Sequence, residues 1–249
     1  MKPLLLAVDS GNTRIKWGLH DGHTWLKQGA VAQGKKALLE QEWKSLREPS
    51  RIVISNVGGT EAKAALSEVI SRWEAEPLWI TAVAYQCGVR NYYTYPEQLG
   101  SDRWAALVAA WELEGQGCLV VDAGTAMTVD ALSDTGEFLG GIITPGIDLM
   151  QKMSLGDITP LKPEDGKFCD YPDNTADALY SGAMHAMAGA VERMAALLAG
   201  TLGHVPECIL SGGAAQQLQP LLKVNTKVMD DLVLQGLAVI ARESSETPV

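Results

Sequence analysis

Two stretches of the sequence decide the fold, because they read almost alike: Leu5–Thr13 is LLAVDSGNT and Cys118–Ala126 is CLVVDAGTA. Each is a short apolar run that ends in an aspartate, Asp9 or Asp122, with a glycine two residues later. Alternating apolar residues follow both copies, as in the second strand of a hairpin. An internal repeat sets the whole architecture of a chain. This one predicts two similar halves.

A second, weaker repeat follows each copy. Arg51–Ser55 precedes paired glycines, and so does Glu207–Ser211. A short apolar run, a serine, glycines and then a helix-like stretch predict a strand followed by a helix. The distance between the two repeated features is longer in the second half. We therefore expect an insertion there, within Thr144–Thr201.

Hydrophobic periodicity predicts the remaining elements. Strands are expected as a hairpin over residues 4–19 and at 51–55, 78–81, 118–122, 126–131, 138–144 and 207–211. Helices are expected at residues 35–46, 61–74, 103–112, 176–199 and 214–222. Strands mixed with helices in two tandem copies indicate an α/β fold. Its halves, residues 1–114 and 115–249, are expected to face each other across a cleft.

The composition is that of an ordinary globular protein. Of 249 residues, 47% are hydrophobic and 20% are charged, which excludes disordered, collagen-like and disulfide-scaffold proteins. Lys and Arg number 20 against 30 Asp and Glu, so the net charge is -10. That is the wrong sign for binding a phosphate backbone or an anionic membrane. We expect neither nucleic acid nor membrane as a partner.

The cysteines and the N-terminal stretch indicate the compartment. The chain has four cysteines: Cys87, Cys118, Cys169 and Cys208. Their spacing matches neither a zinc ribbon nor a redox CxxC motif. Free thiols are typical of a reducing compartment. The apolar run Leu4–Val8 is too short, and too soon interrupted by Asp9, for a signal peptide or a membrane span. The protein is therefore predicted to be cytoplasmic.

The repeated turns carry groups that suit a phosphorylated ligand. A strand that ends in a carboxylate and turns through glycine and small polar residues offers an acid for a metal ion and backbone N–H groups for an anion. Lys16 adds a cation after the first turn. One such turn is more often a plain β-hairpin. Two in register favour a clamp for a nucleoside triphosphate and its cation.

The segment Gly100–Arg103 lies where a loop meets a helix, so its N–H groups and the helix dipole favour an anion. Asp102 can accept a hydroxyl proton, and Arg103 can bind a carboxylate through two parallel hydrogen bonds. These residue types suit a small hydroxy acid as substrate. The alternative is structural, with Asp102 capping the helix and pairing with Arg103.

The turns resemble the phosphate-binding hairpins of the superfamily of sugar kinases, acetate kinase, actin and the 70-kDa heat-shock ATPases. Within it, four motifs in order look like the signature of type III pantothenate kinases: Asp9–Lys16 (DSGNTRIK), Tyr93–Trp104 (YTYPEQLGSDRW), Asp122–Ala126 (DAGTA) and Gly140–Gly146 (GGIITPG). The resemblance runs from Leu4 to about Ala241. It implies two tandem RNase H-like, actin-like ATPase halves.

The resemblance implies ATP-dependent phosphorylation of pantothenate to 4′-phosphopantothenate, the first step of coenzyme A biosynthesis. Asp102 matches the general base that takes the proton of the primary hydroxyl. The matching substrate-binding residues are Tyr93, Gly100, Ser101, Asp102, Arg103 and Thr175. Tyr93 has an alternative as a half-exposed aromatic packed on its loop, and Thr175 as the N-cap of the long helix.

The nucleotide and cation ligands are also implied by the resemblance. The residues that match the nucleotide-binding ones are Asp9, Ser10, Gly11, Asn12, Thr13, Arg14, Ile15, Lys16, Gly124 and Thr125. Asp122 matches the ligand of a monovalent cation, K⁺ or NH₄⁺. Asp9 is expected near Mg²⁺ through a water molecule, because magnesium sheds its hydration reluctantly. In-line transfer of the γ-phosphoryl group needs positioning and charge neutralisation more than covalent help.

A homodimer is predicted from the helix expected at residues 176–199. Apolar side chains recur there at helical spacing among alanines: Met184, Met187, Val191 and Met194. This face is larger than one small half can cover, and the family resemblance implies a dimer as well. The cation and pantothenate sites are expected close to the shared interface.

Two other functions fit parts of the pattern. A sugar or small-carboxylate kinase of the same superfamily would keep the hairpins and lack the Gly-x-Asp-Arg pocket. A non-catalytic regulator is the second, since some relatives have been named as accessory factors for virulence gene expression. Such a transcription-accessory homologue would be free to lose Asp102, Arg103 or Asp122. All three are present, which favours the enzyme.

Overall fold

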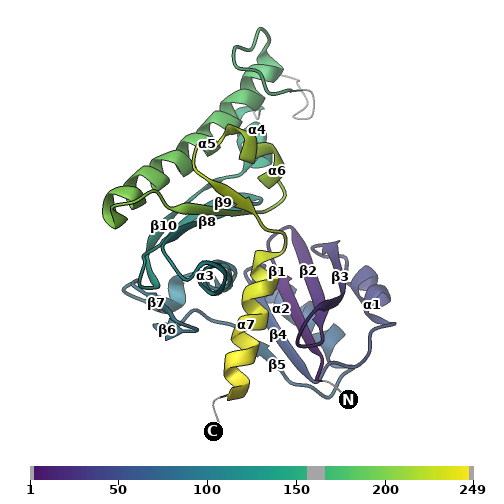
Figure 1. Ribbon diagram of the computed structural model, residues 1–249. Helices are drawn as coiled ribbons and strands as arrows, with labels where there is room; N and C mark the ends of the chain where they lie inside the picture. The colour runs from purple at the N-terminus through teal and green to yellow at the C-terminus, as the bar shows by residue number, and fades with distance from the viewer. Residues whose placement is uncertain (1–2, 156–165, 247–249) are drawn as a thin grey trace. The chain divides into compact units, whose positions relative to one another are not determined.

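The computed structural model describes residues 3–155 and 166–246. The chain forms two compact units, the first from Met1–Leu113 and Asp231–Val249 and the second from Glu114–Asp230. Figure 1 shows the elements of both. The first of these boundaries lies one residue before the expected division after residue 114. Residues 231–249 were expected in the second half, whereas they belong to the first unit.

A mixed sheet of five strands forms the first unit, in the order β3-β2-β1-β4-β5. Its strands are β1 (Leu5–Ser10), β2 (Arg14–His20), β3 (Trp25–Ala32), β4 (Arg51–Asn56) and β5 (Pro77–Trp79). β2 is antiparallel to β1 and β3, and β4 is parallel to β1 and β5. The sequence predicted all of these strands except β3, whose side chains are mostly exposed.

One hydrophobic core of this unit lies on one face of the sheet. The helices that contribute to it are α1 (Lys36–Trp43) and α2 (Gly59–Ile70). Leu6 and Val8 of β1 point into that core, and Trp43 packs edge-on against Trp17, with ring centroids 6.1 Å apart. Because successive side chains of a strand point to opposite faces, Asp9 points away from this core.

Helix α7 (Leu232–Glu246) explains why the C-terminal segment belongs to the first unit. It packs against β1, β2 and β4 (Figure 1), and its Leu237 and Ile240 are completely buried. A Cβ at Gly236 would lie 1.8 Å from the carbonyl oxygen of Ala105, so α7 also touches the helix that follows the substrate loop. The sequence prediction did not include this helix.

The segment between β5 and that helix holds short elements. They are β6 (Tyr85–Gln86), β7 (Val89–Asn91), the 3-10 turn η1 (Pro96–Gln98) and helix α3 (Ser101–Glu114). β6 and β7 pair as an antiparallel hairpin. Helix α3 begins two residues before the predicted start at residue 103. Its first turn therefore includes Ser101 and Asp102 of the predicted substrate pocket.

The second unit repeats the sheet of the first. Its strands are β8 (Cys118–Ala123), β9 (Ala126–Leu132), β10 (Glu137–Pro145), β11 (Glu207–Ser211) and β12 (Thr226–Val228). They lie in the order β12-β11-β8-β9-β10, with β8 antiparallel to β9 and parallel to β11. Order and directions match the first unit strand for strand, as the sequence repeat predicted.

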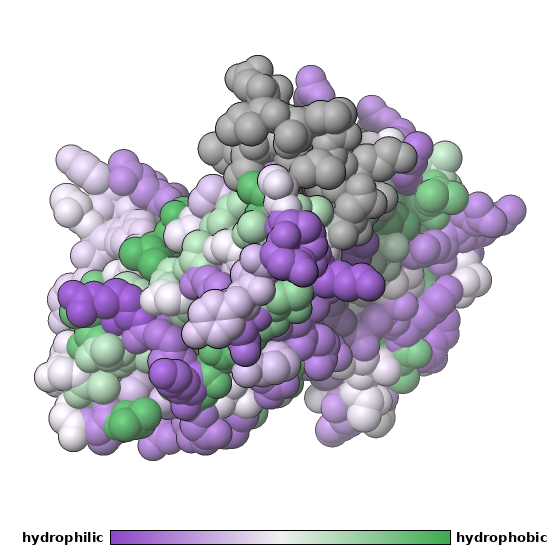
Figure 2. Space-filling view, turned by 90° about the horizontal axis from the view of Figure 1, so that it is seen from above, coloured by the Kyte–Doolittle hydropathy of each residue, from purple (hydrophilic) through white to green (hydrophobic). Residues whose placement is uncertain are grey.

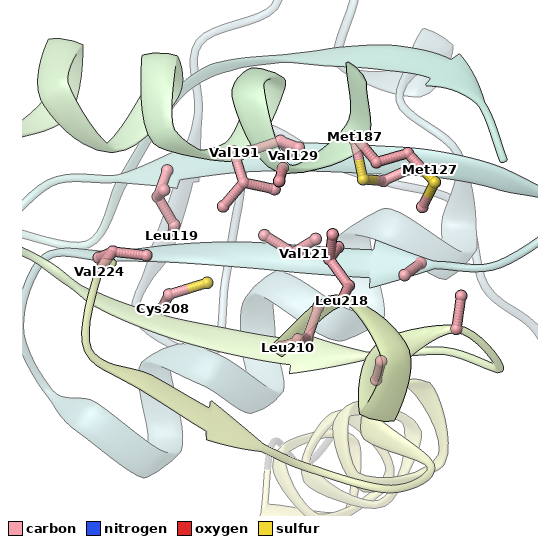
Figure 3. Close-up of a cluster of buried hydrophobic side chains, with 14 of the residues drawn as sticks. Leu119, Val121, Met127, Val129, Met187, Val191, Cys208, Leu210, Leu218 and Val224 are labelled. Atoms are coloured by element: carbon pink, nitrogen blue, oxygen red, sulfur yellow. The ribbon is translucent and has the colours of Figure 1, made fainter. Parts of the chain in front are cut away.

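Helices between β10 and β11 form the expected insertion. The helices of this unit are α4 (Ile147–Leu155), α5 (Thr175–Leu202) and α6 (Ala215–Leu218), followed by the 3-10 turn η3 (Gln219–Leu221). Figure 3 shows Met187 and Val191 of α5 against Met127 and Val129 of β9. The apolar face that suggested a dimer thus covers the unit's own sheet, since Met187 and Val191 are completely buried.

Within residues 3–155 and 166–246, no helix is long and apolar enough to cross a membrane. Hydrophilic and hydrophobic residues are interspersed over the face shown in Figure 2. Apolar side chains that stay exposed include Ile143, Tyr171 and Val205, which lie far apart in the sequence.

Candidate active site

The first predicted phosphate turn connects β1 to β2. Ser10 and Ile15 are its last paired residues, and the N–H of Gly11 donates to the carbonyl oxygen of Arg14 at 3.0 Å. Residues 12–14 are exposed, whereas the side chains of Ser10 and Ile15 are buried. The exposed part of this turn is therefore residues 12–14.

Asp9 is the centre of a row of side chains across the sheet. Its register partners are Lys16 on β2 and Ser55 on β4, and partners in register lie on the same face. The Nζ atom of Lys16 also lies 3.3 Å from the carboxylate of Asp231, just before α7. The fold thus places the predicted cation beside the predicted acid and gives that cation a second carboxylate.

Gln33 supports the first turn and was missed by the sequence analysis. Its Nε2 donates to the carbonyl oxygen of Gly11 at 2.8 Å and to Oγ of Ser10 at 3.2 Å. Its backbone N–H donates to the carbonyl oxygen of Thr13 at 2.8 Å. Gln33 directly follows β3, so the signal for it would have been the recognition of that strand.

The second predicted turn connects β8 to β9 and is one residue shorter. Ala123 pairs with Met127, and Thr125 is exposed. The N–H of Gly146, at the end of β10, donates to the carbonyl oxygen of Thr125 at 2.9 Å. A Cβ at Gly146 would lie 2.2 Å from the carbonyl oxygen of Gly124. The last glycine of the GGIITPG motif is therefore required by close packing of β10 on this turn.

Asp122 occupies the position in the second sheet that Asp9 has in the first. Its register partners are Thr128 on β9 and Ser211 on β11. Gly212 follows Ser211 with a φ of +99°, and a Cβ there would lie 2.4 Å from Oδ1 of Asp122. The Asp122 carboxylate thus lies beside two hydroxyl-bearing residues and a glycine backbone, which are oxygen-rich surroundings suitable for a cation.

The turn glycines, Gly11 and Gly124, differ from Gly146 and Gly212. Neither has a positive φ, and the nearest atom to a Cβ built on either one is 3.4 Å away. The chain itself could accept a side chain at both positions. A missing side chain at these turns leaves room for a polyanion to approach the backbone N–H groups.

The substrate loop places Asp102 as the second residue of α3. Its Oδ1 accepts the backbone N–H of Arg103 at 2.8 Å, and a Cβ at Gly100 would lie 2.5 Å from that same oxygen. Burial raises the pKa of the Asp102 carboxyl, while the backbone N–H and the charge of Arg103 oppose that shift. The Gly100 carbonyl accepts the first helical hydrogen bond, from the Trp104 N–H, so Gly100 and not Asp102 is the N-cap residue.

Arg103 and Tyr93 come together beside Asp102. The Arg103 side chain is buried, and its Nη1 donates to the Tyr93 hydroxyl at 3.4 Å. Asn91 holds the intervening loop, because its Oδ1 accepts the Tyr93 N–H at 3.0 Å and its Nδ2 donates to the Pro96 carbonyl at 3.1 Å. Asn91 was not predicted from the sequence, because it acts through contacts with its own loop.

Thr175 is the first residue of α5, in the second unit, and its side chain is exposed. The alternative that it caps this helix is wrong, because Asn174 is the N-cap and its Oδ1 accepts the Asp177 N–H at 2.9 Å. The Thr175 hydroxyl thus stays exposed at a helix N-terminus.

Metal ligands do not gather in a preformed centre in the described parts of the chain. There, no group of three or more His, Cys, Asp or Glu side chains is arranged to hold an ion. Asp9 and Asp122 would therefore hold cations together with hydroxyl groups, water or the phosphates of a nucleotide, which is how Mg²⁺ commonly binds in kinases.

Comparison with known sequences supports the predicted family. The sequence model of the type III pantothenate kinase family matches residues 5–197. A protein of Nitrosospira multiformis named type III pantothenate kinase is 77% identical over 247 residues, which cover 99% of this chain and 94% of that protein. The chain belongs to the type III pantothenate kinase family. Its activity is the phosphorylation of pantothenate in coenzyme A biosynthesis, with ATP, which confirms the function predicted from the sequence.

Solved structures confirm the predicted actin-like ATPase fold. A Campylobacter jejuni protein whose name places it in the Baf family of transcriptional activators matches with a TM-score of 0.60 and 22% identity, over 97% of this chain and 100% of that one. The ADPNP-bound activator of 2-hydroxyisocaproyl-CoA dehydratase from Clostridium difficile matches with a TM-score of 0.54 and 12% identity, over 98% and 95%. Likeness at these identities shows the fold alone.

Proposed function

We propose that Asp102 is the general base of the pantothenate kinase reaction of this chain. The observation that carries the proposal is the position of its carboxylate, largely buried in the first turn of α3 beside the buried Arg103. Asp102 takes the proton of the primary hydroxyl of pantothenate while that oxygen attacks the γ-phosphorus of ATP in line, and ADP leaves. Burial raises the pKa of Asp102, which makes the carboxylate a stronger base.

Arg103 and Tyr93 bind the carboxylate of pantothenate in this proposal. The guanidinium and the phenol hydroxyl already lie within 3.4 Å of each other, and a guanidinium binds carboxylates through parallel hydrogen bonds. Gly100 and Ser101 shape the pocket, and Thr175, with its exposed hydroxyl at the start of α5, is proposed as a further substrate-binding residue. Ser101 acts through its backbone, since its side chain is buried.

The two turns bind the phosphates and their cations. Residues 9–16 together with Gly124 and Thr125 contact the nucleotide, Asp9 lies near Mg²⁺ through water, and Asp122 holds K⁺ or NH₄⁺. The donors fit these ions, because carboxylate, hydroxyl and water oxygens are their preferred ligands. Bound cations offset the charge of the phosphates beside two acids. Lys16 can release Asp231 for a phosphate, because a partly exposed ion pair contributes at most about 1 kcal/mol.

A homodimer and a cytoplasmic location complete the proposal. The dimer now rests on family resemblance alone, because the methionine face of α5 covers its own sheet. The location rests on the four cysteines, Cys87, Cys118, Cys169 and Cys208, all free thiols, which fit a reducing compartment. Light scattering at assay concentration tests the dimer, and a stable, fully active monomer would remove it.

Substrate choice tests the pocket. ADP release by the purified protein is measured with pantothenate, with pantetheine and with a panel of sugars, each in K⁺ and in Na⁺ at equal ionic strength. Pantothenate in K⁺ is expected to be the best substrate. Pantetheine lacks the carboxylate that Arg103 would bind, so its KM should be higher. Turnover of sugars in preference to pantothenate would support the rival kinase, and no turnover at all would support the regulator.

A further inference from the structure

A buried hydroxyl pair connects the Asp9 row to the substrate loop. Ser55 is the register partner of Asp9 on β4, and its Oγ lies 2.9 Å from Oγ of Ser101. Ser55 is 0% exposed and Ser101 is 7% exposed, so water does not replace this bond easily. The two residues are 46 positions apart in the sequence.

The pair has direct consequences for Asp102. Ser101 is the first residue of α3 and directly precedes Asp102. On its other side, Gly100 lies so close that a Cβ would be 2.5 Å from Oδ1 of Asp102. The first turn of α3, which carries the carboxylate, is thus tied to the sheet through Ser55.

We propose that Ser55 is a positioning residue that fixes Asp102 relative to Asp9 through its hydrogen bond with Ser101. The inference rests on the proposed function of Asp102 and Asp9. Ser55 touches neither substrate nor nucleotide in this account. It positions the first turn of α3, which carries Asp102, and it does so from the β4 position that is in register with Asp9.

Loss of this hydrogen bond should affect catalysis more than the strength of the bond alone suggests. A buried hydroxyl that loses its only partner costs about 1–3 kcal/mol, so the loop would move to find a new one. Displacement of a reacting group by about 1 Å can cost about 100-fold in rate. A loosened Asp102 would also gain water, which lowers its pKa toward the ordinary carboxyl value.

The test compares Ser55→Ala, Ser101→Ala and the double variant in the full-length protein. Each single change is expected to lower kcat about 10- to 100-fold, with the KM for ATP changed less than about twofold. The double variant should lose no more than the worse single one, because the same bond is removed once. The acid limb of the pH profile of kcat should move to lower pH.

Ser133→Ala is the matched control, since Ser133 is also a buried serine with hydrogen-bonded Oγ, but it follows β9 in the second unit. It should lower thermal stability without moving the pH profile.

Ser55→Ala and Ser101→Ala with normal kcat and only a lower Tm would overturn the positioning role. If Ser55→Ala does not fold, Ser101→Ala tests the same bond from the other side. Asp102→Asn distinguishes failure of the proposed function from failure of the role of Ser55. If Asp102→Asn keeps full activity, Asp102 is not the general base. If Asp102→Asn is inactive while both serine variants are normal, only the positioning role of Ser55 is removed.

Discussion

The two phosphate turns share one strand arrangement and differ in what surrounds their aspartates. In the first sheet, Asp9 is in register with Lys16 and Ser55. In the second, Asp122 is in register with Thr128 and Ser211. A serine on the parallel neighbour is common to both, while the antiparallel neighbour changes from a cation to a hydroxyl. The two copies thus share a scaffold, and one position gives each aspartate a different neighbour: Lys16 beside Asp9 and Thr128 beside Asp122.

The support of the turns differs in the same way. The residue after β3 is Gln33, which holds the first turn through its side chain. The residue after β10 is Gly146, which allows the backbone to pack directly on the second turn. One copy fills the space beneath the turn with an amide, and the other removes the side chain. The first turn is one residue longer, which agrees with the larger support beneath it.

The largest expected difference between the copies is their cation dependence. Asp122→Ala should lower pantothenate phosphorylation about 100-fold or more and abolish its activation by K⁺ or NH₄⁺, because an ion worth several kcal/mol loses its anionic ligand. Asp9→Ala should be as inactive but keep its residual dependence on K⁺. Rates are measured in Na⁺, K⁺ and NH₄⁺ at equal ionic strength. Equal wild-type rates in all three would assign Asp122 to Mg²⁺ or to structure.

A smaller effect is expected from filling the space under the second turn. In Gly146→Ala the new Cβ would meet the Gly124 carbonyl oxygen at 2.2 Å and the Thr125 carbonyl oxygen at 2.7 Å. Overpacking of this kind costs about 1–3 kcal/mol, and the displaced turn should also weaken K⁺ activation. Gly189→Ala is the control, since Gly189 lies within α5 with nothing within 4 Å of its Cβ. Thermal unfolding should show a loss for the first variant and none for the second.

The corresponding change under the first turn should cost less. Gln33→Ala removes hydrogen bonds of 2.8 and 3.2 Å to Gly11 and Ser10, worth about 1 kcal/mol net. We expect the KM for ATP to rise about fivefold with kcat little changed. Gln41→Ala, at an exposed position of α1, is the control. A fall in kcat with an unchanged KM would show that Gln33 acts on the substrate loop.

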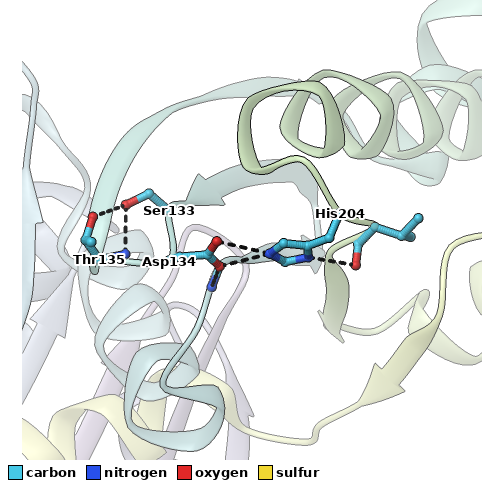
Figure 4. Close-up of polar contacts among 6 residues, drawn as sticks. Ser133, Asp134, Thr135 and His204 are labelled. Carbon is cyan, nitrogen blue, oxygen red and sulfur yellow. Dashed lines mark hydrogen bonds and ion pairs between the residues drawn. The ribbon is translucent and has the colours of Figure 1, made fainter.

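The smallest effect concerns the turns at the other end of the hairpins. In the first unit, Asp21 accepts the N–H groups of His23 and Thr24 in its own turn. In the second, Asp134 lies 3.0 Å from Nε2 of His204, as Figure 4 shows. That hydrogen bond raises the pKa of His204. The pKa of Asp134 is lowered, first by the Gly117 N–H and then by His204.

These shifts predict the sign of a small pH dependence of stability. The contribution of His204 is complete below its ordinary pKa and is lost as the pH rises through the raised value of the folded state. The contribution of Asp134 is present above its ordinary pKa and is lost as the pH falls through the lowered one. Thermal unfolding from pH 5 to 9 should show a shallow decline at the alkaline side that His204→Asn removes. An unchanged slope in that variant would locate the titration elsewhere.

The sequence predicted those helices and strands whose hydrophobic pattern agrees with their burial in the folded protein. β1, β4, β8 and β11 are continuous apolar runs that become central strands. β3 was missed because its side chains are mostly exposed, and β6, β7 and β12 because they span only two or three residues. Helix α7 was missed although it carries buried residues. It lies in the first unit because the chain passes back from the second unit to the first at Asp231. No local sequence pattern encodes that step.

The site follows the same rule. Asp9, Asp122 and Asp102 were recognised because each stands at the end of a strand or the start of a helix, where sequence patterns are strongest. Ser55 and Gln33 act on residues that lie 46 and 22 to 23 positions away. Such partners become visible only when the sheet brings them together.

Kinetics of Asp102→Asn beside Asp148→Asn distinguish a general base from a structural carboxylate at the start of a helix. Both aspartates are the second residue of a helix, α3 or α4, but Asp148 is exposed. Asp102→Asn is expected to lower kcat for pantothenate about 10²- to 10⁴-fold while ATP still binds and Tm is nearly unchanged. Asp148→Asn is expected to turn over like wild type. Near wild-type turnover of Asp102→Asn would rule out Asp102 as the general base and leave it a structural role at the start of α3.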